Sequence, residues 1–148
     1  MARNYYVNGF ATLGVDKTAV ELVTTTAIRP KVYEIMVSCS ATPASQAALW
    51  QFKRHTGTGT GTGQTVNKMD PADPTALVTA KVNNTVEPTY TAGDIPWELA
   101  VNQQASFDWK ANPGREIVLA ASATAGGGLK TSTSTGTAVH QGSLMWEE

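Results

Sequence analysis

Alternation of apolar and polar side chains, with a period of two residues, is the pattern that most constrains the fold of this chain. Residues 31–40 place an apolar side chain at successive odd positions: Tyr33, Ile35, Val37 and Cys39. Because neighbouring side chains of a β-strand point to opposite faces, this pattern predicts a half-buried strand. Seven further segments are predicted strands on the same grounds: 5–13, 18–27, 48–54, 95–101, 106–110, 115–122 and 143–147. About eight strands in a chain of this length predict an all-β, antiparallel β-sandwich or jelly roll.

Composition agrees with this fold class and restricts the partners. A chain of 148 residues supplies one hydrophobic core, so we predict a single jelly-roll-like domain over residues 1–148. Only 16% of residues are charged and the net charge is −1, so no basic surface field would attract nucleic acid or an anionic membrane. We therefore expect neither partner. Sparse charge also predicts poor solubility for an isolated chain, which favours a place inside an assembly.

Three further sequence features limit where such a chain works. Cys39 is the only cysteine, which excludes an internal disulfide and a multi-thiolate metal site. Residues 35–52 carry no charge, but Ser, Thr, Gln and Pro residues interrupt them, so we predict two strands and a turn rather than a membrane span. The first residues contain no apolar run of signal-peptide length, and we expect assembly in a cytoplasm.

Turn-forming residues separate the predicted strands. Residues 112–114, with the sequence Asn-Pro-Gly, predict a tight turn, and the three glycines at 126–128 are assigned the same role. Asp70 and Asp73 are each followed by proline, the usual order of an N-cap residue and the first helical residue. We therefore predict one short helical turn near Pro71–Ala76.

Two segments have low sequence complexity. Residues 57–63 alternate glycine and threonine, and residues 131–137 contain only threonine, serine and glycine. Because neither buries enough apolar surface to offset its ordering entropy, we predict a flexible Gly/Thr loop over residues 57–65 and a Gly/Ser/Thr-rich loop or edge strand over residues 126–142. A phosphate-binding loop would need a Lys-Ser/Thr ending or a following helix, and the chain continues with Gln64 and Thr65. The candidate interaction residues are Thr58, Thr60, Thr62 and Gln64.

Residues that could support catalysis or bind a metal are few and scattered. His55 stands beside Lys53 and Arg54, and His140 lies in a Thr/Gly-rich segment. Because neither has a second ligand at a useful spacing, we predict two separate, solvated histidines and no metal site. We expect no cofactor.

Carboxylates and the thiol favour structural roles. Asp70 and Asp73 are predicted caps rather than calcium ligands. Glu98 and Asp108 belong to separate strands and form a weak basis for a glycosidase pair. Cys39 continues an apolar face and is predicted to be a buried, inert thiol. The expectation is that the protein is no enzyme and has no catalytic residues.

All four tryptophans fall on apolar strand faces: Trp50, Trp97, Trp109 and Trp146. Each ring would bury roughly 150–250 Å² in a core, so core packing is favoured over an exposed platform for stacking on sugars. The platform remains the alternative, and it requires at least one exposed ring.

A set of short segments carries a resemblance to a known family. They are Met1-Ala-Arg-Asn-Tyr-Tyr-Val, Lys31-Val-Tyr-Glu-Ile, residues 46–54 with the Gly/Thr stretch, Met69-Asp-Pro-Ala-Asp-Pro, Val82-Asn-Asn-Thr, Pro113-Gly-Arg-Glu-Ile and Gly142-Ser-Leu-Met-Trp-Glu-Glu. In order and spacing, over nearly the whole chain, they resemble small virion proteins of tailed phages that have a single jelly-roll domain.

The resemblance implies a capsid decoration (cement) protein. Such a protein would bind and stabilise the lattice of the major capsid protein on the virion surface as a homo-oligomer, often a trimer over three-fold positions. It implies assembly in the host cytoplasm and carries no catalytic residue. Three alternatives remain: a tail, fibre or baseplate module that binds a host glycan, a small β-sandwich enzyme, and a secreted adhesion domain.

Overall fold

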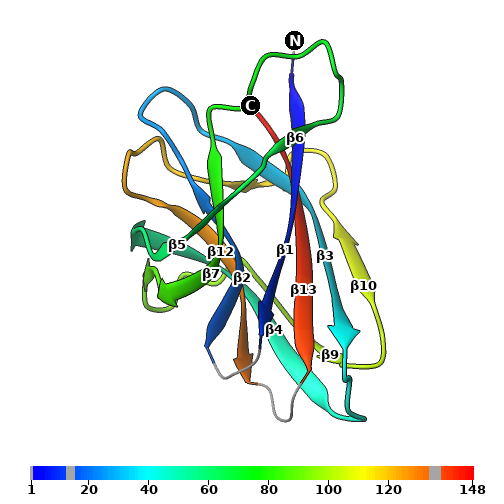
Figure 1. The fold of residues 1–148 in the computed structure, drawn as a ribbon. Coiled ribbons are helices and arrows are strands. Elements are labelled where there is room, and N and C mark those ends of the chain that lie inside the picture. Colours follow the sequence, from blue (N-terminus) through cyan, green and yellow to red (C-terminus); the bar gives the residue numbers. More distant parts are fainter. Residues whose placement is uncertain (1, 13–15, 134–137) are drawn as a thin grey trace.

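The computed structural model describes residues 2–12, 16–133 and 138–148. Two antiparallel sheets pack face to face as a β-sandwich (Figure 1), which confirms the predicted all-β fold class. The described residues form no helix, and therefore none that could cross a membrane.

The first sheet has the strand order β10-β3-β13-β1-β6, and β11 also pairs with β3. Its strands are β1 (Asn4–Thr12), β3 (Lys31–Ala41), β6 (Asn67–Lys68), β10 (Phe107–Lys110), β11 (Ile117–Val118) and β13 (Val139–Glu147). The first and last long strands, β1 and β13, are neighbours over their whole length. Arg3 and Glu148 exchange two backbone hydrogen bonds, so the two ends of the chain lie side by side (Figure 1).

The second sheet has the order β5-β7-β2-β12-β4-β8, and β9 also pairs with β4. Its strands are β2 (Lys17–Val23), β4 (Ala47–Gly57), β5 (Thr60–Gln64), β7 (Thr79–Val86), β8 (Thr89–Tyr90), β9 (Trp97–Asn102) and β12 (Gly126–Thr133). Among the described residues none of these strands pairs with the next strand in sequence, so the sheet depends on contacts between separate parts of the chain.

The core fills the space between the sheets. Trp50, Trp146, Tyr5 and Phe52 are its largest fully buried side chains, and Trp97 is also buried. Trp109 is partly buried and packs against this core. Core packing, the favoured interpretation of the tryptophans, is thus confirmed for three of the four rings and partly for Trp109.

Most predicted strands are present, with changed limits. The segment predicted over 115–122 keeps only the two residues of β11, and the one predicted over 18–27 ends at Val23. Two long strands were missed, β7 and β12. The sequence of β7, Thr-Ala-Lys-Val-Asn-Asn-Thr-Val, alternates weakly because it buries small and polar residues as well as valine.

Two low-complexity predictions are wrong. Residues 60–64 form an edge strand, β5, where a loop was predicted over 57–65. Residues 126–133 form β12, a central strand between β2 and β4, and residues 139–142 belong to the central strand β13. The interpretation of 126–142 as a loop or edge strand therefore fails for the described part; residues 134–137 lie outside the described residues.

The short helical turn predicted near Pro71–Ala76 is smaller than expected. It is a single turn, in which the Asp73 amide donates to the Asp70 carbonyl at 3.1 Å. The Asp70 carboxylate accepts from the Ala72 amide at 2.9 Å, so the capping role of this residue is present. The turn does not extend because Pro74 has no N–H to donate and disfavours helical dihedrals in the residue before it.

Candidate functional site

The four candidate interaction residues follow the edge of the second sheet. Thr58, Thr60 and Thr62 are exposed, whereas Gln64 is half-buried and donates to the Asn8 carbonyl at 2.9 Å. Two of the glycines between them, Gly59 and Gly61, lie against the molecule: a Cβ at Gly61 would fall 2.0 Å from Asn84 Oδ1. In this part of the Gly/Thr alternation glycine thus provides the closely packed positions.

Residues 57–60 carry the chain from β4 to β5 and are called the crossover here. The two strands lie on opposite sides of β2 and β12 in the second sheet. On β2, Glu21 stands between the core residues Val20 and Leu22, so its side chain points away from the first sheet. Glu21 is nevertheless 0% exposed, because the crossover and β7 cover it.

Glu21 is the centre of a buried polar cluster. Its carboxylate accepts a hydrogen bond from the Gly59 amide at 2.9 Å and another from Asn84 Nδ2 at 2.8 Å. His55 Nε2 lies 3.6 Å from Glu21 Oε1. Lys81 Nζ donates to the Gly59 carbonyl at 2.7 Å. Since buried charges need such partners, the carboxylate fixes the crossover to the second sheet. We call these five residues the crossover cluster.

His55 is a neutral member of this cluster. Burial lowers the pKa of its imidazole and nearby Lys81 acts in the same direction, while Glu21 and the Leu22 carbonyl oppose the shift. Its Nε2 lies 3.1 Å from the Leu22 carbonyl oxygen and donates to it in the neutral ring. Among the described residues Nδ1 has no hydrogen-bond partner, so a proton added there would be buried without an acceptor.

The stability of the protein is therefore expected to fall in mild acid. The unfolded chain binds a proton at the ordinary histidine pKa of 6.5, and the folded chain only at lower pH. The contribution of His55 is thus complete above about pH 6.5 and is lost as the pH falls through the folded pKa. The loss is at most about 1.4 kcal/mol per pH unit for one histidine.

Urea unfolding between about pH 8 and pH 5 measures this effect. His55→Gln should flatten the pH dependence relative to the unsubstituted chain. His140, whose pKa is also lowered by burial, provides the comparison: His140→Gln should remove a separate part of the slope. An unchanged slope in His55→Gln would contradict a neutral, buried His55.

The prediction of two solvated histidines is wrong. His55 is 2% exposed and His140 is 0% exposed. The crossover and the Tyr90 ring, whose centroid is 6.1 Å away, cover His55. His140 lies in β13 and packs edge-on against Trp50, with ring centroids 5.4 Å apart. The described residues contain no group of three or more potential metal ligands.

A second group of polar residues surrounds Tyr90. Its hydroxyl lies 2.6 Å from Thr18 Oγ1, and the Thr18 hydroxyl donates to Glu87. Lys130 Nζ lies 4.8 Å from the Tyr90 ring centroid and Lys53 Nζ 5.6 Å. Burial raises the pKa of Tyr90, so the phenol remains protonated and acts as a structural hydrogen-bonding group.

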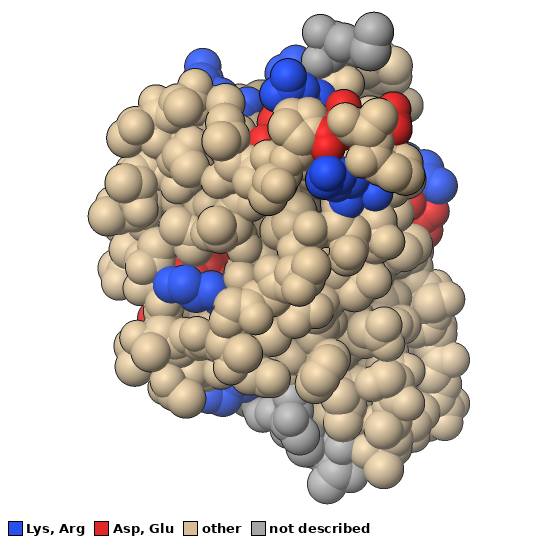
Figure 2. All heavy atoms as spheres, turned by 45° about the horizontal axis from the view of Figure 1, so that its top comes forward, with Lys and Arg blue, Asp and Glu red and all other residues tan. Residues whose placement is uncertain are grey.

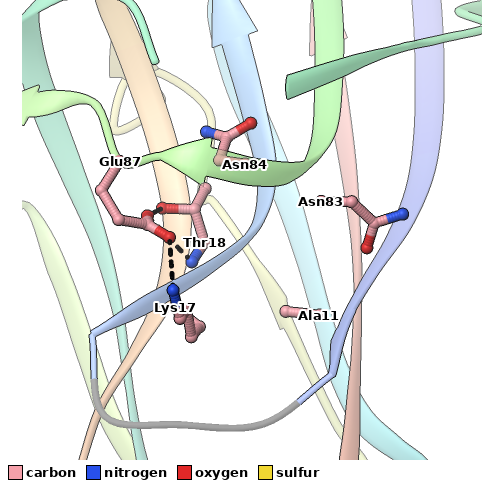
Figure 3. Close-up of a pocket in the computed structure, with 6 residues that line it drawn as sticks. All are labelled: Ala11, Lys17, Thr18, Asn83, Asn84 and Glu87. Carbon is pink, nitrogen blue, oxygen red and sulfur yellow. Dashed lines mark hydrogen bonds and ion pairs between the residues drawn. The ribbon is translucent and has the colours of Figure 1, made fainter. Parts of the chain in front are cut away.

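Beside this group is a small polar hollow of about 170 Å³, lined by Ala11, Lys17, Thr18, Asn83, Asn84 and Glu87. In Figure 3 the Lys17, Thr18 and Glu87 side chains meet on one side, and Asn83 lies near Ala11 on the other. The Asn84 amide points away from Glu87, as its bond to Glu21 requires. Most polar groups of this hollow are already bonded to one another, which is the arrangement of a structural site.

A larger hollow, of about 310 Å³, lies on the first sheet between β10, β3 and β13. Asp108 is the one charged residue of its lining. Most outward-pointing positions of the neighbouring strands β1, β3 and β13 hold uncharged residues: Tyr6, Asn8, Phe10, Met36, Ser38, Ser40, Val139, Gln141, Ser143 and Met145. We call these ten residues the neutral face. Phe10 is 50% exposed, and Phe107, which lines the hollow, is 40% exposed.

Charges border the neutral face at one end. Lys110 forms ion pairs with Asp108 at 2.9 Å and Glu34 at 3.7 Å, and Lys31 pairs with Glu147 at 3.4 Å. Figure 2 likewise shows most charged side chains at the top of the view and smaller groups at its left and lower left, with a broad uncharged area between them. This molecule therefore has a large surface that costs less free energy to dehydrate than a charged surface would.

The remaining candidate residues do not come together. Glu98 is in the second sheet and contacts Gln51, whereas Asp108 is in the first sheet. Cys39 is half-buried, and burial raises the pKa of its thiol, which agrees with an unreactive role. Glu21 was missed; its only signal in the sequence is a charge between two apolar residues of a predicted strand.

Comparison of this chain with protein-family models, with curated proteins and with solved structures gives no match.

Proposed function

We propose that this protein is a virion structural protein, a capsid decoration protein that docks on the lattice of the major capsid protein through the neutral face. The neutral face supports the proposal, because four of its ten uncharged residues line a hollow together with the partly exposed Phe107. The one charged residue of that lining, Asp108, is already paired with Lys110. Covering such a surface requires no burial of unpaired charge. A stable interface buries roughly 1,200–2,000 Å² in total, and a sheet of this size can provide its share of that area.

In this role the protein is not an enzyme, and it acts by holding neighbouring shell subunits together. We propose that it works as a homo-oligomer on the capsid surface, a trimer by the family resemblance, assembled in the host cytoplasm. The competing role, a tail or fibre module that stacks on a host glycan, needs an exposed tryptophan. Three of the four tryptophans are buried, and this weakens the glycan role.

The proposal is tested by placing a charge in the hollow. Ser38→Asp is expected to weaken binding to shells at least tenfold, because docking would bury an unpaired carboxylate at a cost of about 1.4 kcal/mol or more. The shells would be assembled from the major capsid protein encoded in the same genome, and co-sedimentation would measure bound protein. Ser38 is half-buried at the surface of β3, so the fold should tolerate the change.

Thr79→Asp is the matched control, because Thr79 is exposed on β7 of the opposite sheet. It should bind shells as the unsubstituted protein does. If the unsubstituted protein does not sediment with shells, or if both variants bind equally well, the proposed docking through the neutral face is wrong.

A further inference from the structure

The edge strands of the two sheets differ in how they are protected against pairing with another chain. Exposed edges are usually shielded by charge, by proline or by shortness. In the described chain β10 carries Asp108 and Lys110, β9 carries Glu98, and β6 is two residues long and includes Lys68. The edge strands β8 and β11 are also two residues long.

β5 has none of these protections. It is five residues long with the sequence Thr-Gly-Thr-Gly-Gln, and the chain has no charged residue or proline from Thr56 to Asn67. Among the described strands it pairs only with β7. Its other edge therefore presents backbone N–H and C=O groups that a further strand can bind.

Hydrogen bonds within the monomer fix the position of β5 and of the residue that precedes it. The Gly59 amide is bound by Glu21, and the Gly59 carbonyl by Lys81. Thr85 Oγ1 donates to the Thr60 carbonyl at 3.2 Å, and Gln64 reaches the Asn8 carbonyl. Because these contacts order β5 within the monomer, a partner strand would lose less entropy on pairing than it would with a free loop.

We infer that β5 pairs antiparallel with β5 of a second copy of this chain, across a two-fold axis. In such a pair the residue on the axis faces its own copy, so a charge at the middle of the strand would repel the same charge of the second copy. β5 is uncharged and has the β-branched Thr62 at its middle, so it satisfies that condition. A foreign strand is usually selected by side-chain pockets or charges, and β5 provides neither.

This inference goes beyond docking on a shell and does not depend on it. A two-fold contact can join two single chains or two trimers. Five residues make a small contact, so the pairing alone is weak and becomes strong when many copies are held close together.

Sedimentation equilibrium of the purified protein, without shells, tests the pairing. The average mass should rise with concentration towards twice that of the smallest species. Thr62→Lys, at the middle of β5, should weaken this association at least tenfold, because two ammonium groups would meet at the axis. Thr79→Lys, an equal charge on the interior strand β7, should leave it unchanged. An equimolar mixture of Thr62→Lys and Thr62→Glu should associate again, since opposite charges then face each other.

Circular dichroism and thermal unfolding would confirm that each variant folds. The inference is overturned if the unsubstituted protein shows no doubling, if Thr62→Lys associates as strongly as the unsubstituted protein, or if Thr79→Lys weakens association as much as Thr62→Lys does. Shell binding by Thr62→Lys is measured separately, so that loss of self-pairing with intact shell binding leaves the proposed function standing.

Discussion

Replacing Glu21 by leucine is expected to lower the free energy of unfolding by about 3 kcal/mol or more. The change removes the acceptor of the Gly59 amide and of Asn84 Nδ2, both buried. An unsatisfied buried donor costs roughly 1–3 kcal/mol, and here two donors lose their partner together. The crossover should loosen as well, which hydrogen exchange at residues 57–60 would detect as faster exchange.

Two further variants make this prediction specific. Glu21→Gln should be much milder, because its carbonyl oxygen can accept from Gly59 while the Asn84 amide turns over to accept from its NH₂ group. Glu147→Leu is the matched control: Glu147 also lies on a strand, but its ion pair with Lys31 is exposed and contributes at most about 1 kcal/mol. Urea unfolding measures all three. Equal stability of Glu21→Leu and the unsubstituted protein would show that the crossover cluster contributes nothing.

Adding a methyl group to the central strand β12 should have an effect of similar size. A Cβ at Gly126 would lie 1.9 Å from the Leu22 carbonyl oxygen, and one at Gly128 would lie 2.1 Å from the Tyr90 hydroxyl oxygen. Backbone cannot move aside cheaply, so Gly126→Ala is expected to cost about 3 kcal/mol or to prevent folding. Gly128→Ala meets a side chain, but one that is half-buried and bonded to Thr18.

The control is Gly63→Ala in β5, where no atom lies within 4 Å of the new Cβ. It should be neutral or stabilise the protein by up to about 1 kcal/mol, because alanine restricts the unfolded chain. Tyr90→Phe should recover part of the loss in Gly128→Ala, since it removes the atom that clashes. Thermal and urea unfolding measure each variant. If Gly126→Ala and Gly63→Ala were equally stable, the close packing of β12 would be refuted.

Strand-forming segments with a clear alternation were predictable because their own residues place apolar side chains on one face, and that face is buried. The apolar positions Ile35 and Val37 of β3 are buried, as are Trp50 and Phe52 of β4. The same logic failed for β12, whose sequence starts with three glycines. Glycine marks a turn when nothing is packed beside it, and a close approach when a ring such as Phe52 lies against it.

The crossover cluster could not be predicted for a related reason. Glu21 is in β2, His55 in β4 and Asn84 in β7, and no local pattern connects these segments. Hydrogen bonds between them form only because the crossover passes over β2. The neutral face was anticipated only in general terms, as sparse charge; its position required the register of β1, β3 and β13.

The sequence by itself determined the class of fold and most of the large residues that supply the core, because alternation and aromatic content act within each segment. The tertiary structure alone decided which polar residues are buried. It also decided that one glycine-rich segment, β12, is a central strand and that the other, β5, is an edge strand. The physical reason is that side-chain environment depends on both faces of a strand. A segment encodes which of its own faces is apolar, but what covers the other face comes from distant parts of the chain.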